Sequence, residues 1–366
     1  MQFIKRNAVA VIAFLAAVVT AFIVFPDAEY LDYFDFKTLA CLFSVLAVIC
    51  ALKRIRFFYW LSYKVIRLSK NMRIAALALV YITFVGSMLI ANDMALITFL
   101  PLGFMVLSVT HQEKYMARLF ILQNIAANLG GMLTPFGNPQ NLYLYSKFNI
   151  PDGQFLSIMA PSFLLSIALF SLCCVLFFKP EKLELPDEDF RIPKVRTIFY
   201  LVLFALAIIM VFRILPYFVG LAIILTALLI YDREALKHVD YPLLLTFVFF
   251  FIFAGNMARI EPVRAFVSGL LAKNTLIVST LSCQFISNVP SAILLSQFTD
   301  NYPALLVGVN IGGTGTIVAS LASLITFREY TRLNKGKGGS YLLLFLAFNF
   351  SFLLILVLFN TLLGVR

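Results

Sequence analysis

The chain has 366 residues, of which 62% are hydrophobic and only 13% are charged. A soluble domain is about half apolar and a quarter charged, so the composition excludes an ordinary soluble protein and favours one body solvated by lipid. The net charge of +11 does not indicate a nucleic-acid partner, because Lys and Arg lie in short segments between apolar runs, as in cytoplasmic loops.

Long apolar runs predict the elements. A membrane-spanning helix needs about 20 mostly apolar residues. In chain order, runs of this kind lie near 7–25, 36–52, 119–147, 154–179, 197–213, 217–231, 241–255, 303–327 and 340–362. Two further apolar segments, 74–110 and 274–298, are each interrupted by a short polar break. The sequence therefore predicts an all-α polytopic membrane protein.

The charges in the loops predict its orientation. Residues 26–37 carry four acidic residues against Lys37 alone, whereas residues 53–73 carry seven basic residues and no acid. The positive-inside rule then places the N-terminus and 53–73 in the cytoplasm and, by counting crossings, the C-terminus outside the inner (plasma) membrane. Residues 55–72 mix basic and apolar side chains, which is typical of an amphipathic interfacial helix, and 259–272 resemble its counterpart on the other side.

An internal repeat organises the chain. Asn128-Leu129-Gly130-Gly131 followed by Thr134 recurs as Asn310-Ile311-Gly312-Gly313 followed by Thr316, each downstream of one interrupted apolar segment. We divide the chain into a span and outer loop (1–30), a first repeat (31–179), a cytoplasmic linker (180–196) and a second repeat (197–366). Each repeat contains a hairpin (74–110, 274–298) and a broken helix (119–147, 303–327).

The breaks in these segments point to a binding site. Each splits its apolar segment into arms of about a dozen residues, which suits a re-entrant hairpin with its tip in the membrane. Counting crossings makes the two hairpins enter from opposite faces, as in transporters built from inverted repeats. Non-helical backbone inside a membrane is tolerated only in protein or beside an aqueous cavity. The glycines beside the breaks let a ligand approach the backbone, although a single pair would also fit tight helix packing.

Asp93 is the acidic residue predicted to lie in the middle of the membrane. Its break reads Ala91-Asn92-Asp93, and the break of the second segment reads Ser287-Asn288-Val289. A buried carboxylate is costly unless it is protonated or paired. Asp93 is therefore expected to carry a proton, to bind a cation, or both; the alternative is a protonated residue that only caps the second arm.

The same residues resemble a known group. ANDMALITFLPL from Ala91, LGGMLTPFGNPQN ending at Asn141 and SNVPSAILL from Ser287 are similar to the first tip, unwound helix and second tip of the ion transporter superfamily. That group includes divalent anion:sodium symporters, citrate transporter-like proteins, arsenite-efflux permeases and certain sodium:proton antiporters. The similarity runs in order over roughly 30–362.

The resemblance implies an elevator-type carrier, usually a homodimer. In the symporters each tip reads Ser-Asn-Thr and helps to bind sodium and the substrate carboxylate. Here the first tip keeps only Asn92, its Asp93 resembles the arsenite permeases, and the second tip has Val289 in place of Thr. Asn138 and Gln140 also depart from the Gly-Ser/Thr-Pro-Pro-Asn pattern of the unwound helix. These departures weigh against dicarboxylate or citrate specificity.

We therefore expect a secondary transporter of a small anion or ion, coupled to sodium or protons, with the lipid bilayer and a small substrate as its partners. Expected ligands of the coupling ion are Asn92, Asp93, Gly137, Ser287 and Asn288, with sodium bound through Asn92, Asp93 and Asn288. Expected substrate-binding residues are Asn128, Gly130, Gly131, Thr134, Asn138, Pro139, Asn141, Pro290, Ser291, Asn310, Gly312, Gly313, Thr314 and Thr316.

Other functions fit the sequence less well. An aspartyl intramembrane protease needs two Asp residues in the membrane, whereas only Asp93 is predicted to lie there. A serine protease needs a buried His or Lys as its base, and none is predicted in the membrane. A channel would not need inverted repeats. The five cysteines and two histidines form no metal motif, and no cofactor other than sodium is expected. Within transport, a cation:proton antiporter and an arsenite exporter remain alternatives.

Overall fold

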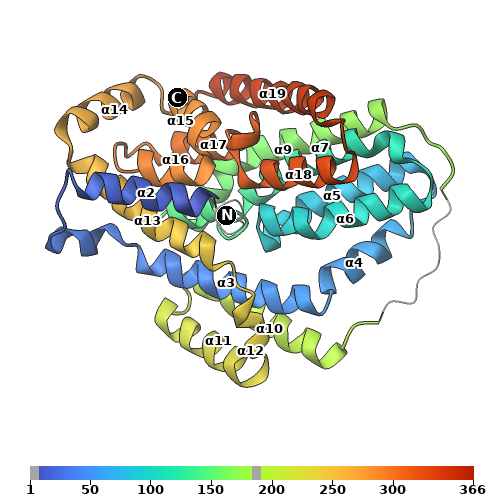
Figure 1. Cartoon of the computed structure of the whole chain (residues 1–366), viewed down its shortest axis with the longest axis horizontal. Helices are drawn as coiled ribbons and strands as arrows, with labels where there is room; N and C mark the ends of the chain where they lie inside the picture. Colours follow the sequence, from blue (N-terminus) through green and yellow to red (C-terminus); the bar gives the residue numbers. More distant parts are fainter. Residues whose placement is uncertain (1–7, 184–190) are drawn as a thin grey trace.

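The computed structural model describes residues 8–183 and 191–366, and every named element in these ranges is a helix (Figure 1). In this part of the chain, seven helices are long and apolar enough to cross a membrane: α3 (Phe36–Arg54), α5 (Met72–Ile90), α6 (Asn92–Val109), α9 (Asp152–Phe177), α10 (Lys194–Val211), α13 (Tyr241–Arg259) and α19 (Gly338–Leu362). The chain is a multi-pass membrane protein, as predicted.

One group of helices extends from mid-height on the left of Figure 1 to its lower edge. Here α13 packs along α2 (Ala8–Ala21), while α3 packs against α10 and α11 (Tyr217–Tyr231), and the short α12 (Arg233–Lys237) follows α11. Helices α2 and α11 have only 14 and 15 residues. Helix α11 and the described part of the predicted span 7–25 are therefore shorter than the about 20 residues that a straight helix needs to cross the hydrocarbon.

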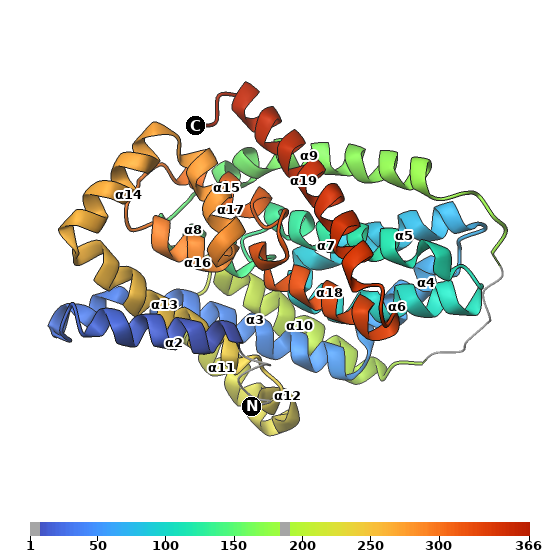
Figure 2. The ribbon, with the colours of Figure 1, turned by 45° about the horizontal axis from the view of Figure 1, so that its top comes forward.

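The remaining helices hold the two hairpins. The α5–α6 hairpin packs on α7 (Met116–Gly130), and the hairpin of α15 (Thr275–Ile286) and α16 (Asn288–Leu295) packs on α17 (Tyr302–Ile311). Figures 1 and 2 show the first hairpin in the right-hand half and the second in the left-hand half, with both tips turned toward the middle. The remaining elements are η1 (Ala28–Tyr33), α4 (Phe57–Ile66), η2 (Glu113–Tyr115), η3 (Gly131–Leu133), α8 (Pro139–Lys147), α14 (Glu261–Lys273), η4 (Ile317–Ala319) and α18 (Leu321–Leu333).

The lengths of the hairpin arms differ from the prediction. The first hairpin has arms of 19 and 18 residues, or about 28 Å of helix at 1.5 Å per residue. The estimate of about a dozen residues is wrong there, because the segment 74–110 itself leaves 17 residues on each side of its break at Ala91-Asn92-Asp93. The second hairpin has arms of 12 and 8 residues, close to the estimate. The amphipathic segments are α4, which is shorter than 55–72, and α14.

Side-chain caps set where these helices begin. Asn71 accepts a hydrogen bond from the N–H of Ile74 at the start of α5, and Asn274 accepts one from Ile277 at the start of α15. Such caps satisfy backbone donors that a helix leaves open at its first turn. Both hairpins thus begin with the same device, which fixes where each first arm starts.

Loops of the right-hand end in Figure 1 are tied together. Lys114 forms an ion pair with Glu181 (2.8 Å), whose carbonyl accepts from the N–H of Met72 (2.8 Å). Asn334 donates to Met116 Sδ (3.1 Å).

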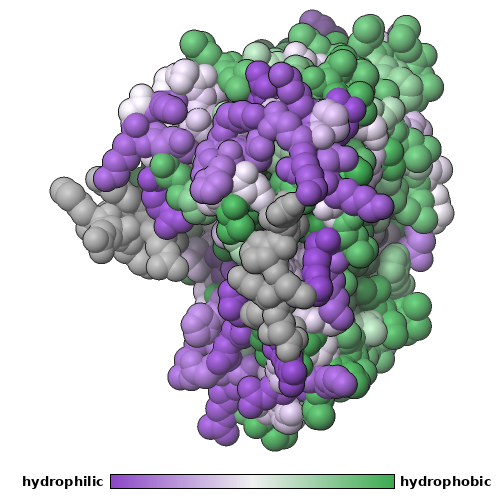
Figure 3. Space-filling view, turned by 90° about the vertical axis from the view of Figure 1, so that its right-hand side faces the viewer, coloured by the Kyte–Doolittle hydropathy of each residue, from purple (hydrophilic) through white to green (hydrophobic). Residues whose placement is uncertain are grey.

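Seen from that end, hydrophilic side chains gather over the centre and left of the face and hydrophobic ones cover the right flank (Figure 3). The apolar flank is what a lipid-facing surface requires.

Candidate functional site

The tip of the first hairpin is a strained, hydrogen-bonded turn. Ala91 joins α5 to α6 with φ 62° and ψ 151°, a region that residues other than glycine rarely adopt. Asn92 is buried; its Oδ1 accepts from the N–H of Asp93 (3.0 Å) and its Nδ2 donates to Asn128 Oδ1 (3.0 Å). Asp93 Oδ1 is buried and has no hydrogen-bond partner. The tip therefore holds a carboxylate oxygen with unused bonding capacity.

The second tip repeats this geometry. Ser287 joins α15 to α16 with φ 73° and ψ 160°, and Asn288 Oδ1 accepts from the N–H of Val289 (2.9 Å). In both tips, a residue with positive φ precedes an Asn that caps the next residue. Such a conformation costs about 1–3 kcal/mol and persists only where surrounding contacts enforce it. Its occurrence at both tips argues for a functional constraint.

In the first broken helix, the carbonyls exposed by the break are bound by one amide. Helix α7 ends at Gly130 and α8 begins at Pro139. Asn141 Nδ2 donates to the carbonyls of Gly131 (3.1 Å), Met132 (3.2 Å) and Thr134 (3.3 Å). These bonds satisfy acceptors that the end of a helix leaves open.

In the second broken helix, between α17 and α18, the amide of Gln284 binds the carbonyls exposed by the break. Its Nε2 donates to the carbonyls of Gly312 (2.9 Å) and Thr314 (3.1 Å), and its Oε1 accepts from the N–H of Thr316 (2.9 Å). The sequence interpretation missed Gln284 because it lies in a hairpin arm. A buried Gln in an apolar helix was the available signal, since buried amides require partners.

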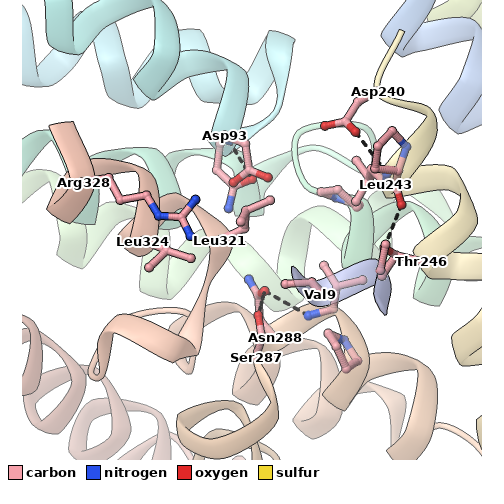
Figure 4. A pocket seen from close by; sticks show the side chains of 16 residues that line it. Val9, Asp93, Asp240, Leu243, Thr246, Ser287, Asn288, Leu321, Leu324 and Arg328 are labelled. Atoms are coloured by element: carbon pink, nitrogen blue, oxygen red, sulfur yellow. Dashed lines mark hydrogen bonds between the residues drawn. The ribbon is translucent and has the colours of Figure 1, made fainter. Parts of the chain in front are cut away.

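A cavity of about 120 Å³ joins these parts. Both tips line it through Asn92, Asp93, Ser287 and Asn288, and Pro139 lines it from the first broken helix. In Figure 4 the tips approach from different sides, with α2, α13 and α18 forming the remaining walls. The described chain thus brings together six segments that are separate in sequence around one small space.

Charged groups flank this cavity. Asp93 lies on one side and Asp240, at the start of α13, on the other, with their carboxylates turned toward each other (Figure 4). Asp240 Oδ1 also accepts from the N–H of Leu243 (3.0 Å). Arg328 of α18 lines a third side. Helices α6, α8, α13, α16 and α18 all begin at this cavity, and helix N-termini carry partial positive charge. The cavity therefore suits a ligand with anionic character accompanied by a cation or proton.

Comparison with known proteins identifies the chain. The family model described as citrate transporter matches residues 1–307. The chain belongs to the citrate transporter family. An uncharacterized transporter of Methanocaldococcus jannaschii, MJ0456, is 35% identical over 306 residues, covering 82% of each chain. The inner membrane protein YbiR of Escherichia coli is 28% identical over 317 residues, covering 84% of this chain and 83% of that protein. The resemblance seen in the sequence is confirmed.

Six of the predicted residues line the transporter's cavity. They are Asn92, Asp93, Pro139, Ser287, Asn288 and Pro290. Most predicted hydroxyls are instead bonded within the wall: Thr134 donates to the Met88 carbonyl (2.8 Å), Thr316 to the Gln284 carbonyl (3.0 Å), and Ser291 bonds Ser282 (2.9 Å). Asn128, Gly130, Gly131, Gly137, Asn138, Asn141, Asn310, Gly312, Gly313 and Thr314 also lie outside the cavity lining in this conformation. Their roles as ligands stay predictions.

Three polar residues of the cavity were missed. Asp240 caps the start of α13 and Thr246 lies in its second turn, while Arg328 lies within α18, directly after the predicted span 303–327; the sequence does not distinguish them from ordinary capping residues and charges beside apolar runs. No cluster of three His, Cys, Asp or Glu side chains that could hold a metal ion occurs in residues 8–183 and 191–366. A cation here would have to be bound by isolated carboxylates, amides and carbonyls.

Proposed function

We propose that this transporter moves a small anion or ion by secondary active transport coupled to sodium or protons. The observation that carries the proposal is the meeting of both hairpin tips at one cavity with Asp93 in its wall. A carboxylate in a membrane that has an unpaired buried oxygen is expected to exchange a proton or a cation. The family and the relatives support transport rather than catalysis.

We further propose that the cavity moves by an elevator mechanism. The two hairpins approach from opposite halves of the molecule and share their tip geometry, which supports inverted repeats. The group formed by α2, α3, α10, α11 and α13 would be the static scaffold, and a homodimer would hold it in place. The hairpins and broken helices would then carry the ligand past α13.

The orientation follows from the loop charges. The tied loops of the right-hand end carry Arg67, Lys70, Arg73 and Lys114, whereas the loop before α3 carries four acids. We propose that the basic end is cytoplasmic, with the N-terminus inside and the C-terminus outside.

A cation:proton antiporter is the second candidate. Two carboxylates, Asp93 and Asp240, line one cavity, and neighbouring carboxylates compete for protons and cations. Arg328 and the converging helix N-termini favour the anion transporter, because an antiporter for cations needs no positive lining.

Thermal unfolding of the purified protein in detergent tests the proposal. Sodium and choline chloride are compared, each with succinate, citrate, phosphate, sulfate or arsenite. A ligand at 100 times its dissociation constant stabilises the folded state by about 2.7 kcal/mol. Stabilisation by one anion that requires sodium or a pH change supports the anion transporter. Stabilisation by sodium or pH alone supports the antiporter, and no response to any condition contradicts both.

Asp93→Asn then tests the coupling residue in liposomes. We expect transport to be abolished or to lose its dependence on sodium and pH, while the protein still folds. Asp300→Asn is the matched control, since Asp300 lies in a loop outside the cavity lining. Unchanged coupled transport in Asp93→Asn removes Asp93 from the mechanism.

A further inference from the structure

Arg213 connects the group of helices proposed as the static scaffold to the part proposed to move. It follows directly after the end of α10, in the scaffold group. Its Nη1 donates to the Ile150 carbonyl (3.2 Å) and its Nη2 to the Tyr145 carbonyl (2.5 Å). Both carbonyls belong to the end of α8 and the turn that leads into α9, in the moving part. We name the contact of Arg213 with Tyr145 and Ile150 the Arg213 latch.

Several interactions fix the guanidinium in this position. Arg213 Cζ lies 4.0 Å from the centre of the Tyr145 ring, whose hydroxyl donates to the Asp152 carboxylate. A cation is attracted to the face of an aromatic ring, and the planar guanidinium can donate to two acceptors at the same time. The C-terminus of α8, which ends at Lys147, carries partial negative charge that also favours a cation. One side chain thus holds the end of α8 against the end of α10.

The backbone at Arg213 indicates that this side chain has a function. Helix α10 ends in a Schellman motif, in which the N–H of Arg213 donates to the Met210 carbonyl (3.1 Å). The N–H of Ile214 donates to the Ile209 carbonyl (3.2 Å) in the same motif. The position of Arg213 requires a positive φ, here 63°, and is usually occupied by glycine. A strained non-glycine residue of this kind is typical of functional positions.

The contact between the two groups has few other polar interactions. Among the residues with described positions, the hydrogen bonds across it are those of Arg213 and one from Lys53 Nζ to Met94 Sδ (3.9 Å), a weak acceptor. Beside the latch, the Phe212 and Phe136 rings pack edge to face with their centroids 6.0 Å apart. Burial of apolar surface has no preferred direction, whereas hydrogen bonds do. The latch therefore favours one position of the moving part over others.

One donor of the guanidinium has no partner in the latch. Arg213 Nε is buried and bonds to no acceptor in the structure. A buried donor without a partner is unfavourable, and water would satisfy it once the latch opens. This cost offsets part of the strength of the latch. The Arg213 latch thus favours the observed conformation without making it permanent.

The cavity shows which conformation the latch favours. Val9 and Ala10 at the start of α2 line it, as do Pro242 and Leu243 at the start of α13. In the orientation proposed above, α2 and α13 both begin on the cytoplasmic side, whereas α10 ends on the outer side. The cavity therefore lies toward the cytoplasm while the latch is closed at the outer end.

We propose that Arg213 is a positioning residue that holds the cavity toward the cytoplasm and must release Tyr145 and Ile150 before the cavity can reach the outer side. The inference rests on the elevator movement of the proposed function and adds the contact that sets the balance between its two end positions. A hydrogen bond from a charged group changes an equilibrium constant by about tenfold or more. Loss of the guanidinium is therefore expected to shift the balance toward the outward-facing position at least about tenfold.

The distance between two spin labels, measured by double electron–electron resonance on the purified full chain in detergent, tests the proposal. The five native cysteines are replaced by alanine, and new cysteines carry the labels. One label replaces Leu31, which is exposed in η1 beside the scaffold, and the other replaces Asp300, which is exposed in the loop before α17. Movement of the hairpins and broken helices along the scaffold changes this distance.

Arg213→Gly and Arg54→Gln are compared with the parent chain. Arg213→Gly removes the guanidinium and places the favoured residue in the Schellman motif, so α10 is expected to end as before. Arg54→Gln is the control, because Arg54 of α3 pairs with Asp232, which directly follows α11, and so connects two scaffold helices. If Arg213→Gly does not fold, Arg213→Lys keeps the test open. Lysine retains the charge but cannot donate to both carbonyls as a planar fork, so a smaller shift in the same direction is expected.

We expect one main distance in the parent chain and in Arg54→Gln. In Arg213→Gly, the ratio of a second distance to the first should rise at least about tenfold. Two distances in the parent chain whose ratio does not change in Arg213→Gly would overturn the latch and leave the elevator movement intact. One distance in every variant would reject both the latch and the elevator movement. Equal changes in Arg213→Gly and Arg54→Gln would also overturn the latch, because they would indicate general loosening of the fold.

Discussion

Asn141→Leu should destabilise the fold through the first broken helix. The substitution keeps the branched shape of the side chain, with bulkier methyl groups, and removes the donor that binds three carbonyls of the break. It also removes the oxygen that accepts from Asn310 Nδ2, which keeps its bond to the Leu306 carbonyl. Thr134 keeps one bond, from the N–H of Gly137 (3.2 Å), so the carbonyls of Gly131 and Met132 bear the loss. A buried polar group left unpaired costs about 1–3 kcal/mol. The free energy of unfolding should therefore fall by about 2–6 kcal/mol, a large part of a typical total.

Reversible unfolding in mixed detergent, in choline chloride without sodium, measures this change. Asn349→Leu is the control: Asn349 is equally buried, and its Nδ2 donates to the Phe345 carbonyl, which lies inside α19 and keeps its helical partner. Its Oδ1 accepts from Asn124 Nδ2 (3.4 Å), which keeps its bond to Ser323 Oγ (3.3 Å). We expect the control to lose about 1 kcal/mol. Equal losses in the two variants would refute the view that the break depends on Asn141.

Three further predictions concern the hairpins and the tied loops. Ala91→Gly should raise the stability by about 1–3 kcal/mol by relieving the positive φ at the tip, measured by thermal unfolding; a loss of stability would contradict the strain. Gly130→Ala should cost about 1–3 kcal/mol because its Cβ would overlap the backbone of α5, whereas Gly153→Ala, with open space around it, should cost nothing. The ion pair with Lys114 lowers the pKa of Glu181. The stabilisation of the loop by this ion pair is therefore fully present above the usual pKa of a Glu side chain. It is lost as the pH falls through the lowered pKa of Glu181. The rate of amide hydrogen exchange in the loop around Glu181, corrected for the pH dependence of exchange in an unfolded chain, should stay constant from pH 8 to 5. The rate should be higher over this whole range in Glu181→Gln.

Much of the fold was readable in the sequence because hydropathy and local backbone chemistry are local properties. Apolar runs and loop charges predicted a multi-pass membrane protein, and Asn92 and Asn288 marked both hairpin tips. The repeated Asn-x-Gly-Gly pattern marked where α7 and α17 end. Unsatisfied backbone groups are so costly in lipid that a break in a membrane helix requires polar residues and glycines, and these are visible in the sequence.

Other features were decided only by the tertiary structure. In the sequence, Asp240 and Arg328 look like ordinary charged residues beside apolar runs. Only the packing of α13 and α18 around the tips turns them toward the cavity. Gln284 serves a break 28 to 32 residues farther along the chain. The amides of Asn138 and Gln140 both donate to Asn310 Oδ1, about 170 residues away. Hydrogen bonding between distant segments leaves no periodic signal, because it depends on which surfaces meet and not on the spacing along either one.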